Sequence, residues 1–355
     1  MPDTAAPETG DIVAPLRLLI DGEALAANWR WLRDRGGEAA CGAAIKANGY
    51  GLGAAGVMQR LAEAGCRDFF VASWLEARAL LPLAEGVSLC VLHGVREEDM
   101  AFALQSGVRP VLSSAEQVAR WKAAGGGACD VMVDTGMNRL GLDWREDLAP
   151  HIAGLDARNL LTHLACADED HPLTPLQRDR FADIAARHPG LRASIANSAG
   201  ICLGRDYAFG LTRPGVALYG AIPRPEARGH IRQVVQPQVQ ILQRRRVRAG
   251  EGIGYNAAAI ASRDLEAAIL NIGYADGYLR GFSGRGEALA DGVRLPVLGR
   301  VSMDLLIVDA TARPELGEGD WVDIAYALPE AAAASGLSQY ELLTGLGARY
   351  ERRWR

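Results

Sequence analysis

The feature that most constrains the fold is a regular alternation of short apolar runs and amphipathic segments between about residues 40 and 220. The apolar runs are continuous, which is typical of parallel strands covered by helices. Eight such units in about 180 residues favour a closed (β/α)8 barrel of the TIM type over an open sheet. The expected strands are residues 41–46, 68–73, 88–93, 107–113, 128–134, 159–164, 192–198 and 213–220.

After about residue 235 the pattern changes to strands broken by Gly, Pro and Asp turns, with few helical segments between them. This pattern predicts a second, mostly β domain at residues 236–355, following a barrel domain at residues 11–235. The α/β chain of 355 residues fits two domains at roughly 150 residues each. Residues 1–10 are expected to form a flexible tail, and a first strand at about 15–20 is a candidate to join the C-terminal domain.

Composition excludes several function classes. The net charge of −5 provides no overall basic field for nucleic acid or an anionic membrane. No apolar run reaches the ~18 residues of a membrane-spanning helix, and the acidic N-terminus does not resemble a signal peptide. Six cysteines are scattered without a CxxC pair, which indicates reduced thiols. A cytoplasmic globular protein is expected.

Lysine is rare in this chain, since only two of its 38 basic residues are lysines. Lys122 lies in an amphipathic helical pattern and is expected on a solvated face. Lys46 ends an apolar run, where an ammonium group is costly to bury unless it is paired or chemically used. Burial lowers the pKa of a lysine, which is the condition for a Schiff-base amine. The glycines that follow Lys46 would let the backbone approach a bound anion.

Other polar residues also follow the predicted strands, at the end of a barrel where active sites lie. They are Ser73, His93, Asp134, His163 and Asn197. Further along, Ser198 lies in Ala196–Gly200, and Arg213 and Gly215 lie in Arg213–Gly220. The last two strands of a barrel commonly form a phosphate site. In the second domain, Ile272–Tyr278 and Gly299–Asp304 are dense in unusual residues.

Two other interpretations compete with a Schiff-base lysine. Gly51–Gly56 is a literal GxGxxG with Glu76 further on, the pattern of a dinucleotide-binding oxidoreductase that uses NAD. That interpretation leaves Lys46 unexplained and requires an open sheet. His163 with the acidic loop 168–171 could be a metal cluster, but the loop lacks the spacing that would make its acids converge, so no metal is expected.

Taken together and in this order, the segments KANGYG, DTGMNRLG, ANSAG, RPGVALYG, GYADGY and GRVSMD closely resemble alanine racemase, a fold-type III pyridoxal-phosphate enzyme. The resemblance runs from about residue 16 to 345. It implies a barrel followed by a β domain, a bacterial cytoplasmic enzyme that interconverts L-alanine and D-alanine, and a supply of D-alanine for peptidoglycan. It also implies a homodimer with two shared active sites.

The resemblance assigns roles residue by residue. Lys46 would form the Schiff base with pyridoxal phosphate, and Tyr274 would be the second base, on the opposite face of the substrate. Arg213 would face the pyridine nitrogen, and His163 would link it to Tyr274. The implied phosphate ligands are Tyr50, Ser198, Gly215, Val216 and Tyr340, and the implied substrate carboxylate contacts are Arg139 and the Met303 amide. In the family, Tyr274 and Met303 come from the other subunit.

Racemisation needs a proton removed on one face of a planar intermediate and returned on the other, so two bases are consistent with the resemblance. A racemase that prefers serine, a basic amino-acid decarboxylase and a non-catalytic pyridoxal-phosphate carrier remain alternatives. One position departs from the family. Many members carry a carbamylated lysine that holds the substrate-side arginine, and here that position is Met132, with Asn138 a second change nearby.

Overall fold

The computed structural model describes residues 13–355, so the tail expected at residues 1–10 lies outside the described residues. The chain divides into two compact units. One consists of residues 13–20 together with Val235–Arg355, and the other is Asp21–Val234. Over the described residues, no helix is both long enough and apolar enough to cross a membrane.

The strands of Asp21–Val234 pair in parallel around a ring. A short strand, β8 (Leu142–Asp143), pairs with β7 beside the ring. The ring closes through β11, where Gly42 N donates to Thr212 O (2.9 Å) and Arg213 N donates to Ala196 O (2.8 Å). With β2 and β3 counted as one interrupted strand, this is the expected eight-stranded barrel. Its strands are β2 (Ala40–Cys41), β3 (Ala43–Ala44), β4 (Asp68–Val71), β5 (Ser88–Val91), β6 (Arg109–Leu112), β7 (Cys129–Asp134), β9 (Ala157–Leu161), β10 (Arg192–Ser194) and β11 (Leu211–Thr212).

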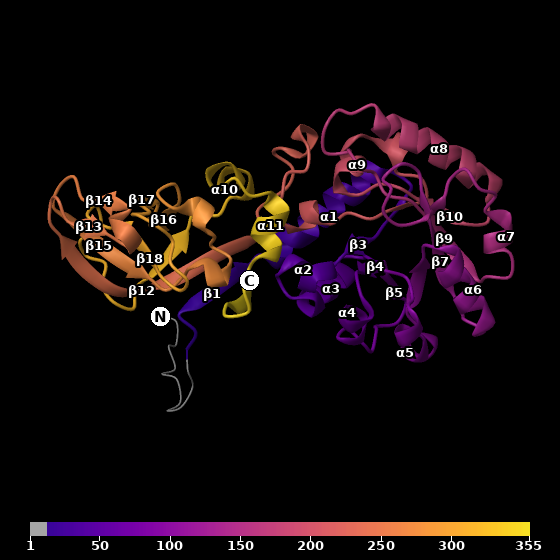
Figure 1. The fold of residues 1–355 in the computed structure, drawn as a ribbon, viewed down its shortest axis with the longest axis horizontal. Helices are drawn as coiled ribbons and strands as arrows, with labels where there is room; N and C mark the ends of the chain where they lie inside the picture. The colour runs from indigo at the N-terminus through magenta and orange to yellow at the C-terminus, as the bar shows by residue number, and fades with distance from the viewer. Residues whose placement is uncertain (1–12) are drawn as a thin grey trace. The chain divides into compact units, whose positions relative to one another are not determined.

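Helices surround these strands, and Figure 1 shows α3, α4, α5, α6 and α8 outside them. Side-chain oxygens cap several helix starts: Asp21 accepts from Ala24 N (2.8 Å), and Ser114 accepts from Gln117 N (3.3 Å). The helices are α1 (Gly22–Gly36), α2 (Lys46–Tyr50), α3 (Ala54–Glu63), α4 (Trp74–Arg78), α5 (Met100–Ser106), α6 (Ala115–Ala123), α7 (Ala149–Ile152), α8 (Leu173–Arg187) and α9 (Ser198–Cys202). Short 3-10 turns are η1 (Glu97–Asp99), η2 (Arg205–Tyr207), η3 (Val216–Tyr219) and η4 (Pro225–Ala227).

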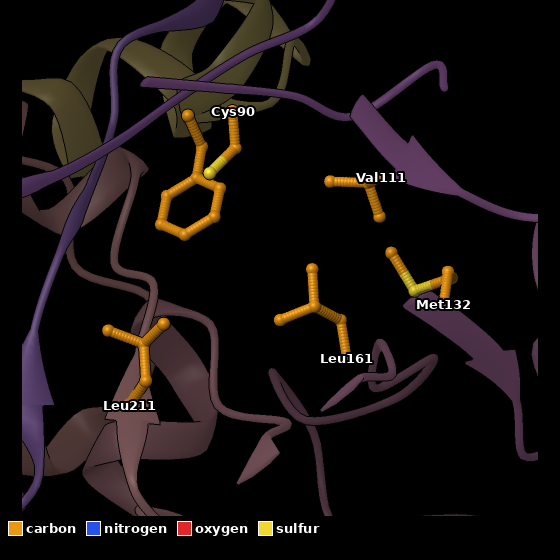
Figure 2. Close-up of a cluster of buried hydrophobic side chains, with 6 residues drawn as sticks. Cys90, Val111, Met132, Leu161 and Leu211 are labelled. Atoms are coloured by element: carbon orange, nitrogen blue, oxygen red, sulfur yellow. The ribbon is translucent and has the colours of Figure 1, made fainter. Parts of the chain in front are cut away.

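A cluster of buried apolar side chains lies inside the barrel, and Figure 2 shows it. The cluster takes one residue from each of six strands: Phe70, Cys90, Val111, Met132, Leu161 and Leu211. Near the amino ends of the strands the interior becomes ionic, since the buried Asp130 accepts from Asn159 Nδ2 (2.8 Å) and lies 3.4 Å from Arg109 Nε. The barrel is therefore a packed core, and chemistry is left to the carboxyl ends of its strands.

Most expected strands are shorter than predicted, and one of them, residues 213–220, contains no strand residue. Residues 213–220 are predominantly the 3-10 turn η3, because Pro214 has no N–H for the sheet and Leu218 N bonds instead to Gly215 O (2.9 Å). The first strand is interrupted at Gly42, where a β-carbon would lie 2.7 Å from Asp68 O. It ends at Ala44, so Lys46 lies beyond the strand, at the start of the short segment α2, whose residues 47–49 do not have helical backbone angles.

The other unit is mostly β. Its longest strand, β12, pairs antiparallel with β1, β15 and β19, while β20 runs parallel to β1. The strands are β1 (Leu16–Ile20), β12 (Val235–Val247), β13 (Gly252–Ile253), β14 (Ala259–Ile260), β15 (Leu265–Leu270), β16 (Glu287–Ala290), β17 (Val293–Pro296), β18 (Leu306–Asp309), β19 (Trp321–Ile324) and β20 (Glu351–Trp354). Its helical segments are η5 (Tyr255–Ala257), η6 (Tyr274–Asp276), η7 (Arg280–Phe282), α10 (Leu328–Ser335) and α11 (Gln339–Thr344).

Candidate functional site

Lys46 stands at the start of an unusual turn. Ala47, Asn48, Gly49 and Tyr50 all adopt left-handed backbone angles, with φ between 51° and 62°. Each non-glycine residue in this region costs roughly 1–2 kcal/mol, so the surroundings must hold the turn. Backbone bonds from Gly49 N to Ile45 O (2.8 Å) and from Gly51 N to Ala47 O (2.9 Å) do part of this. The sequence motif therefore encodes a left-handed turn directly after the lysine.

Cationic groups surround the Lys46 ammonium. Burial lowers its pKa, and the guanidinium groups of Arg139 and Arg213 lower it further, while the Glu76 carboxylate raises it. The net effect is a pKa below the ordinary value of a lysine. A larger fraction of Lys46 is thus the free amine, the form that can attack a carbonyl carbon.

His163 belongs to the same group of side chains. Burial and the charges of Arg213, Arg139 and Lys46 lower its pKa to about 3. The imidazole is consequently neutral, with one ring nitrogen able to donate a hydrogen bond and the other able to accept one. The structure brings together four of the predicted residues. Arg139 and Arg213 lie close enough to lower the pKa of both Lys46 and His163.

Arg213 is buried against neutral partners. Its side chain donates to Thr162 O (2.6 Å) and to Ser194 Oγ, and its guanidinium lies 5.9 Å from the centre of the Phe70 ring. Burial lowers its pKa to about 10, although Asp130 and Cys90 act to raise it. Ser194 was missed by the sequence analysis, although it lies in a predicted strand two residues before the polar Ala196–Gly200 motif.

The predicted phosphate residues of this unit also meet. Ser198 Oγ accepts from Gly215 N (2.9 Å) and Ala217 N (3.2 Å). A β-carbon on Gly215 would lie 2.3 Å from Tyr50 Oη, so only glycine allows this approach. Val216 is 1% exposed, and within the described part of the chain its amide donates no hydrogen bond. A buried N–H without a partner is rare, which indicates an acceptor supplied from outside the chain.

Tyr219 is a further residue that the sequence analysis did not assign. It is fully buried, stacks on Tyr50 at 4.6 Å between ring centroids and donates from its hydroxyl to Ala44 O (2.8 Å). It thereby ties η3 to the strand that leads to Lys46. Its place in the RPGVALYG motif was the available signal.

Arg139 lies in a loop whose backbone is held by the Asp134 carboxylate. Asp134 accepts from the amides of Gly136, Met137 and Arg139, each at 2.8 Å. Burial works to raise the pKa of Asp134, but these backbone donors outweigh it and hold the pKa below its ordinary value. Met132, on the same strand, lies in the apolar interior cluster (Figure 2), so it offers no charge to Arg139.

The two motifs of the other unit lie side by side. Tyr274 N donates to Ser302 O and Ala275 N to Met303 O, both at 3.0 Å. The buried Asp276 accepts from Gly273 N (2.9 Å) and pairs with Arg349 through two bonds of 2.6 and 2.8 Å. These contacts hold Tyr274 and Met303 in one surface region, where the Met303 residue is 53% exposed.

Tyr274 and Tyr340 are the two remaining predicted residues of this unit. The Arg280 guanidinium lies 5.3 Å from the centre of the Tyr274 ring. Tyr340 lies in α11 and is 45% exposed. Both phenols are thus placed on short helical segments at the surface of the unit.

The acidic residues of the two competing motifs have partners within the barrel unit. Glu76, the acid of the GxGxxG pattern, accepts from Ala47 N at 2.6 Å, and the sheet is a closed ring rather than an open one. In the acidic loop, Asp170 pairs with Arg224 at 2.7 Å. No group of three or more metal-ligating side chains occurs among the residues that the structure describes.

Two family models match the chain: the alanine racemase N-terminal domain over residues 20–223 and the alanine racemase C-terminal domain over residues 234–354. The alanine racemase of Acidiphilium cryptum is 42% identical over 350 residues, 94% of this chain and 97% of that protein. That of Rhodospirillum rubrum is 43% identical over 356 residues, 95% of each. A solved alanine racemase from Bartonella henselae, with covalently bound pyridoxal phosphate, is 36% identical with a TM-score of 0.88, covering 97% of this chain and 100% of that chain.

Proposed function

The chain belongs to the alanine racemase family, and from this premise we propose that it interconverts L-alanine and D-alanine with pyridoxal phosphate. The observation that carries the proposal is the meeting of a half-buried lysine of lowered pKa with Arg139, His163 and Arg213 at the carboxyl ends of the barrel strands. A D-alanine supply for peptidoglycan, in the cytoplasm, is the role that the family suggests.

The residues present fit this cofactor. The unpartnered Val216 amide and the close approach of Gly215 to Tyr50 provide donors for a phosphate group. Lys46 provides an amine of lowered pKa for the aldehyde. We assign cofactor contacts to Lys46, Tyr50, His163, Ser198, Arg213, Gly215, Val216 and Tyr340. When bound, the cofactor supplies a conjugated ring that delocalises the electron pair left at Cα.

Two bases then move the proton. Lys46 Nζ removes or returns the Cα proton on one face, and the Tyr274 hydroxyl does so on the other. The Arg213 guanidinium presents N–H donors and a positive charge, so it would disfavour a proton on a cofactor ring nitrogen held against it. His163 is neutral and would link Arg213 to Tyr274 through hydrogen bonds. Arg139 and the Met303 amide hold the substrate carboxylate.

The assembly we propose is a homodimer in which Tyr274 and Met303 of the partner subunit complete each site. The two units would have separate roles: the barrel unit, Asp21–Val234, holds the cofactor, and the unit that includes Val235–Arg355 supplies the second base. Exposure of Met303 and placement of Tyr274 at a surface support this assembly.

The test is direct. Purified protein with pyridoxal phosphate is reduced with borohydride, and the peptides are analysed by mass spectrometry. Because the chain has only two lysines, Lys122 is an internal control for attachment to Lys46. Circular dichroism is then followed after addition of pure L-alanine, with L-serine as a second substrate. Persistence of the L-alanine signal, or attachment at Lys122 alone, would disprove the proposal.

A further inference from the structure

The Glu76 carboxylate connects two strand ends of the barrel. Glu76 lies in α4, after β4, and its Oε2 accepts from Ala72 N (2.7 Å) and Ser73 N (3.4 Å). Its Oε1 accepts from Ala47 N at 2.6 Å. Ala47 is 29 residues away in sequence and immediately follows Lys46. The Ser73 bond belongs to the capping box of α4, whereas the Ala47 bond is not needed for helix capping.

The bond to Ala47 acts where the backbone is under most strain. Ala47 is the first of four consecutive left-handed residues, and three of them are not glycine. Glu76 anchors the amino end of this turn, and Asn48 Oδ1, which accepts from Ala54 N (3.0 Å), anchors it further along. Loss of the first anchor would leave the Ala47 amide, in the peptide that follows Lys46, without its acceptor.

The same carboxylate also raises the pKa of Lys46. Of the charged groups that act on the Lys46 ammonium, Arg139 and Arg213 lower its pKa, and Glu76 opposes them. The neutral His163 adds no charge. The Glu76 carboxylate thus stabilises the ammonium form of Lys46, against the effect of the two arginines.

We propose that Glu76 is a positioning residue for Lys46, holding the backbone directly after it and supplying the negative charge that its surroundings otherwise lack. The proposal rests on Lys46 being the reactive amine of the proposed function. Glu76, the acidic residue that follows the GxGxxG pattern, would then support the reactive lysine instead of a dinucleotide. Glu76 itself would touch neither substrate nor cofactor, because its oxygens accept from backbone amides.

Two variants separate geometry from charge. Glu76→Gln removes the charge and keeps one acceptor oxygen, so Ala47 and Ala72 can no longer both be satisfied. Glu76→Asp keeps the charge on a side chain one methylene shorter, which cannot span both strand ends. Glu116→Gln is the matched control, because Glu116 is likewise in the first turn of its helix, α6, but is exposed.

The first readout uses the protein without cofactor and does not depend on activity. An amine-acylating reagent is applied over a range of pH, and mass spectrometry follows Lys46 and Lys122 separately. Without the opposing carboxylate, Lys46 loses its proton at lower pH. In Glu76→Gln its labelling curve should therefore move to lower pH, while that of Lys122 stays in place. Glu116→Gln should match the wild type.

The second readout is steady-state kinetics of the loaded enzyme. Displacement of a reacting group by about 1 Å can cost ~100-fold in rate, so kcat should fall by about 10- to 100-fold in Glu76→Asp. KM for alanine should change less, because Arg139 and Met303 are untouched. The labelling curve of Lys46 in Glu76→Asp should stay close to that of the wild type.

The outcomes distinguish this proposal from the proposed function. An unchanged Lys46 labelling curve in folded Glu76→Gln together with unchanged kcat in Glu76→Asp overturns the positioning role, even if the wild type racemises alanine. If Glu76→Gln does not fold, the Glu76→Asp kinetics decide alone, and wild-type kcat there overturns the proposal. A wild-type protein that neither racemises alanine nor attaches pyridoxal phosphate at Lys46 overturns the proposed function instead.

Discussion

The Tyr50 hydroxyl oxygen occupies space that a side chain on Gly215 would need, since a β-carbon there would lie 2.3 Å from it. Gly215→Ala should therefore displace the Tyr50 hydroxyl from its place beside residue 215. Overpacking of this kind costs about 1–3 kcal/mol. We expect the dissociation constant for pyridoxal phosphate to rise about 10-fold or more, as measured by fluorescence titration.

Gly190→Ala is the control for this prediction, because nothing lies within 4 Å of a β-carbon there and its φ is not in the left-handed region. It should bind the cofactor as the wild type does. Equal affinities of the Gly215 and Gly190 variants would show that Tyr50 and Gly215 do not form the cofactor site.

Tyr274→Phe removes the phenolic hydroxyl and leaves the ring, so the backbone bonds to the Ser302 loop should persist. Removing one base should lower the rate of racemisation by about 100- to 10,000-fold in both directions. The absorbance of bound cofactor should remain, because Lys46 is unchanged. Loss of that absorbance, or retention of full activity by circular dichroism, would contradict the assignment of Tyr274 as the second base.

Arg349→Met should disturb Tyr274 indirectly. It leaves the Asp276 carboxylate, which is 1% exposed, without its paired guanidinium. Because Arg349 itself is half exposed, the loss of stability should be about 1–2 kcal/mol, below the value for a fully buried pair. Melting temperature and kcat should both fall. Arg353→Met, which breaks only an exposed pair with Glu351, should change neither by a comparable amount.

Asp134 predicts a pH dependence of stability. Its pKa in the folded chain lies below its ordinary value, so the ionised carboxylate stabilises the fold at neutral pH. This contribution is fully present above the ordinary value of 3.8 and is lost as the pH falls through the folded pKa. The difference in melting temperature between wild type and Asp134→Asn should therefore be constant near neutral pH and shrink in acid.

The exposed Asp168 provides the comparison for Asp134. No hydrogen bond or ion pair of its side chain occurs among the described residues. Asp168→Asn should leave the melting temperature unchanged at every pH tested. A pH-independent difference for Asp134→Asn, extending into acid, would mean that its carboxylate is not stabilised by the backbone donors of residues 136–139.

The barrel could be predicted because its strands are buried on both faces and read as continuous apolar runs. The prediction was less accurate where local geometry competes with that pattern. Residues 213–220 are apolar enough for a strand, but Pro214 cannot donate to the sheet, and the chain turns into η3. Lys46 was placed at a strand end, and it in fact begins a left-handed turn that three non-glycine residues share.

By itself, the sequence determined which side chains are available for chemistry: a lysine exceptional among arginines, a histidine, an arginine and glycines, each following a buried run. These local patterns arise because burial and backbone preference act over a few neighbouring residues. Only the tertiary structure decided the partners of those residues, such as Ser194 for Arg213 and Glu76 for the amide after Lys46. Closure of the ring brings distant strand ends within hydrogen-bonding distance, and no local pattern records which ends will meet.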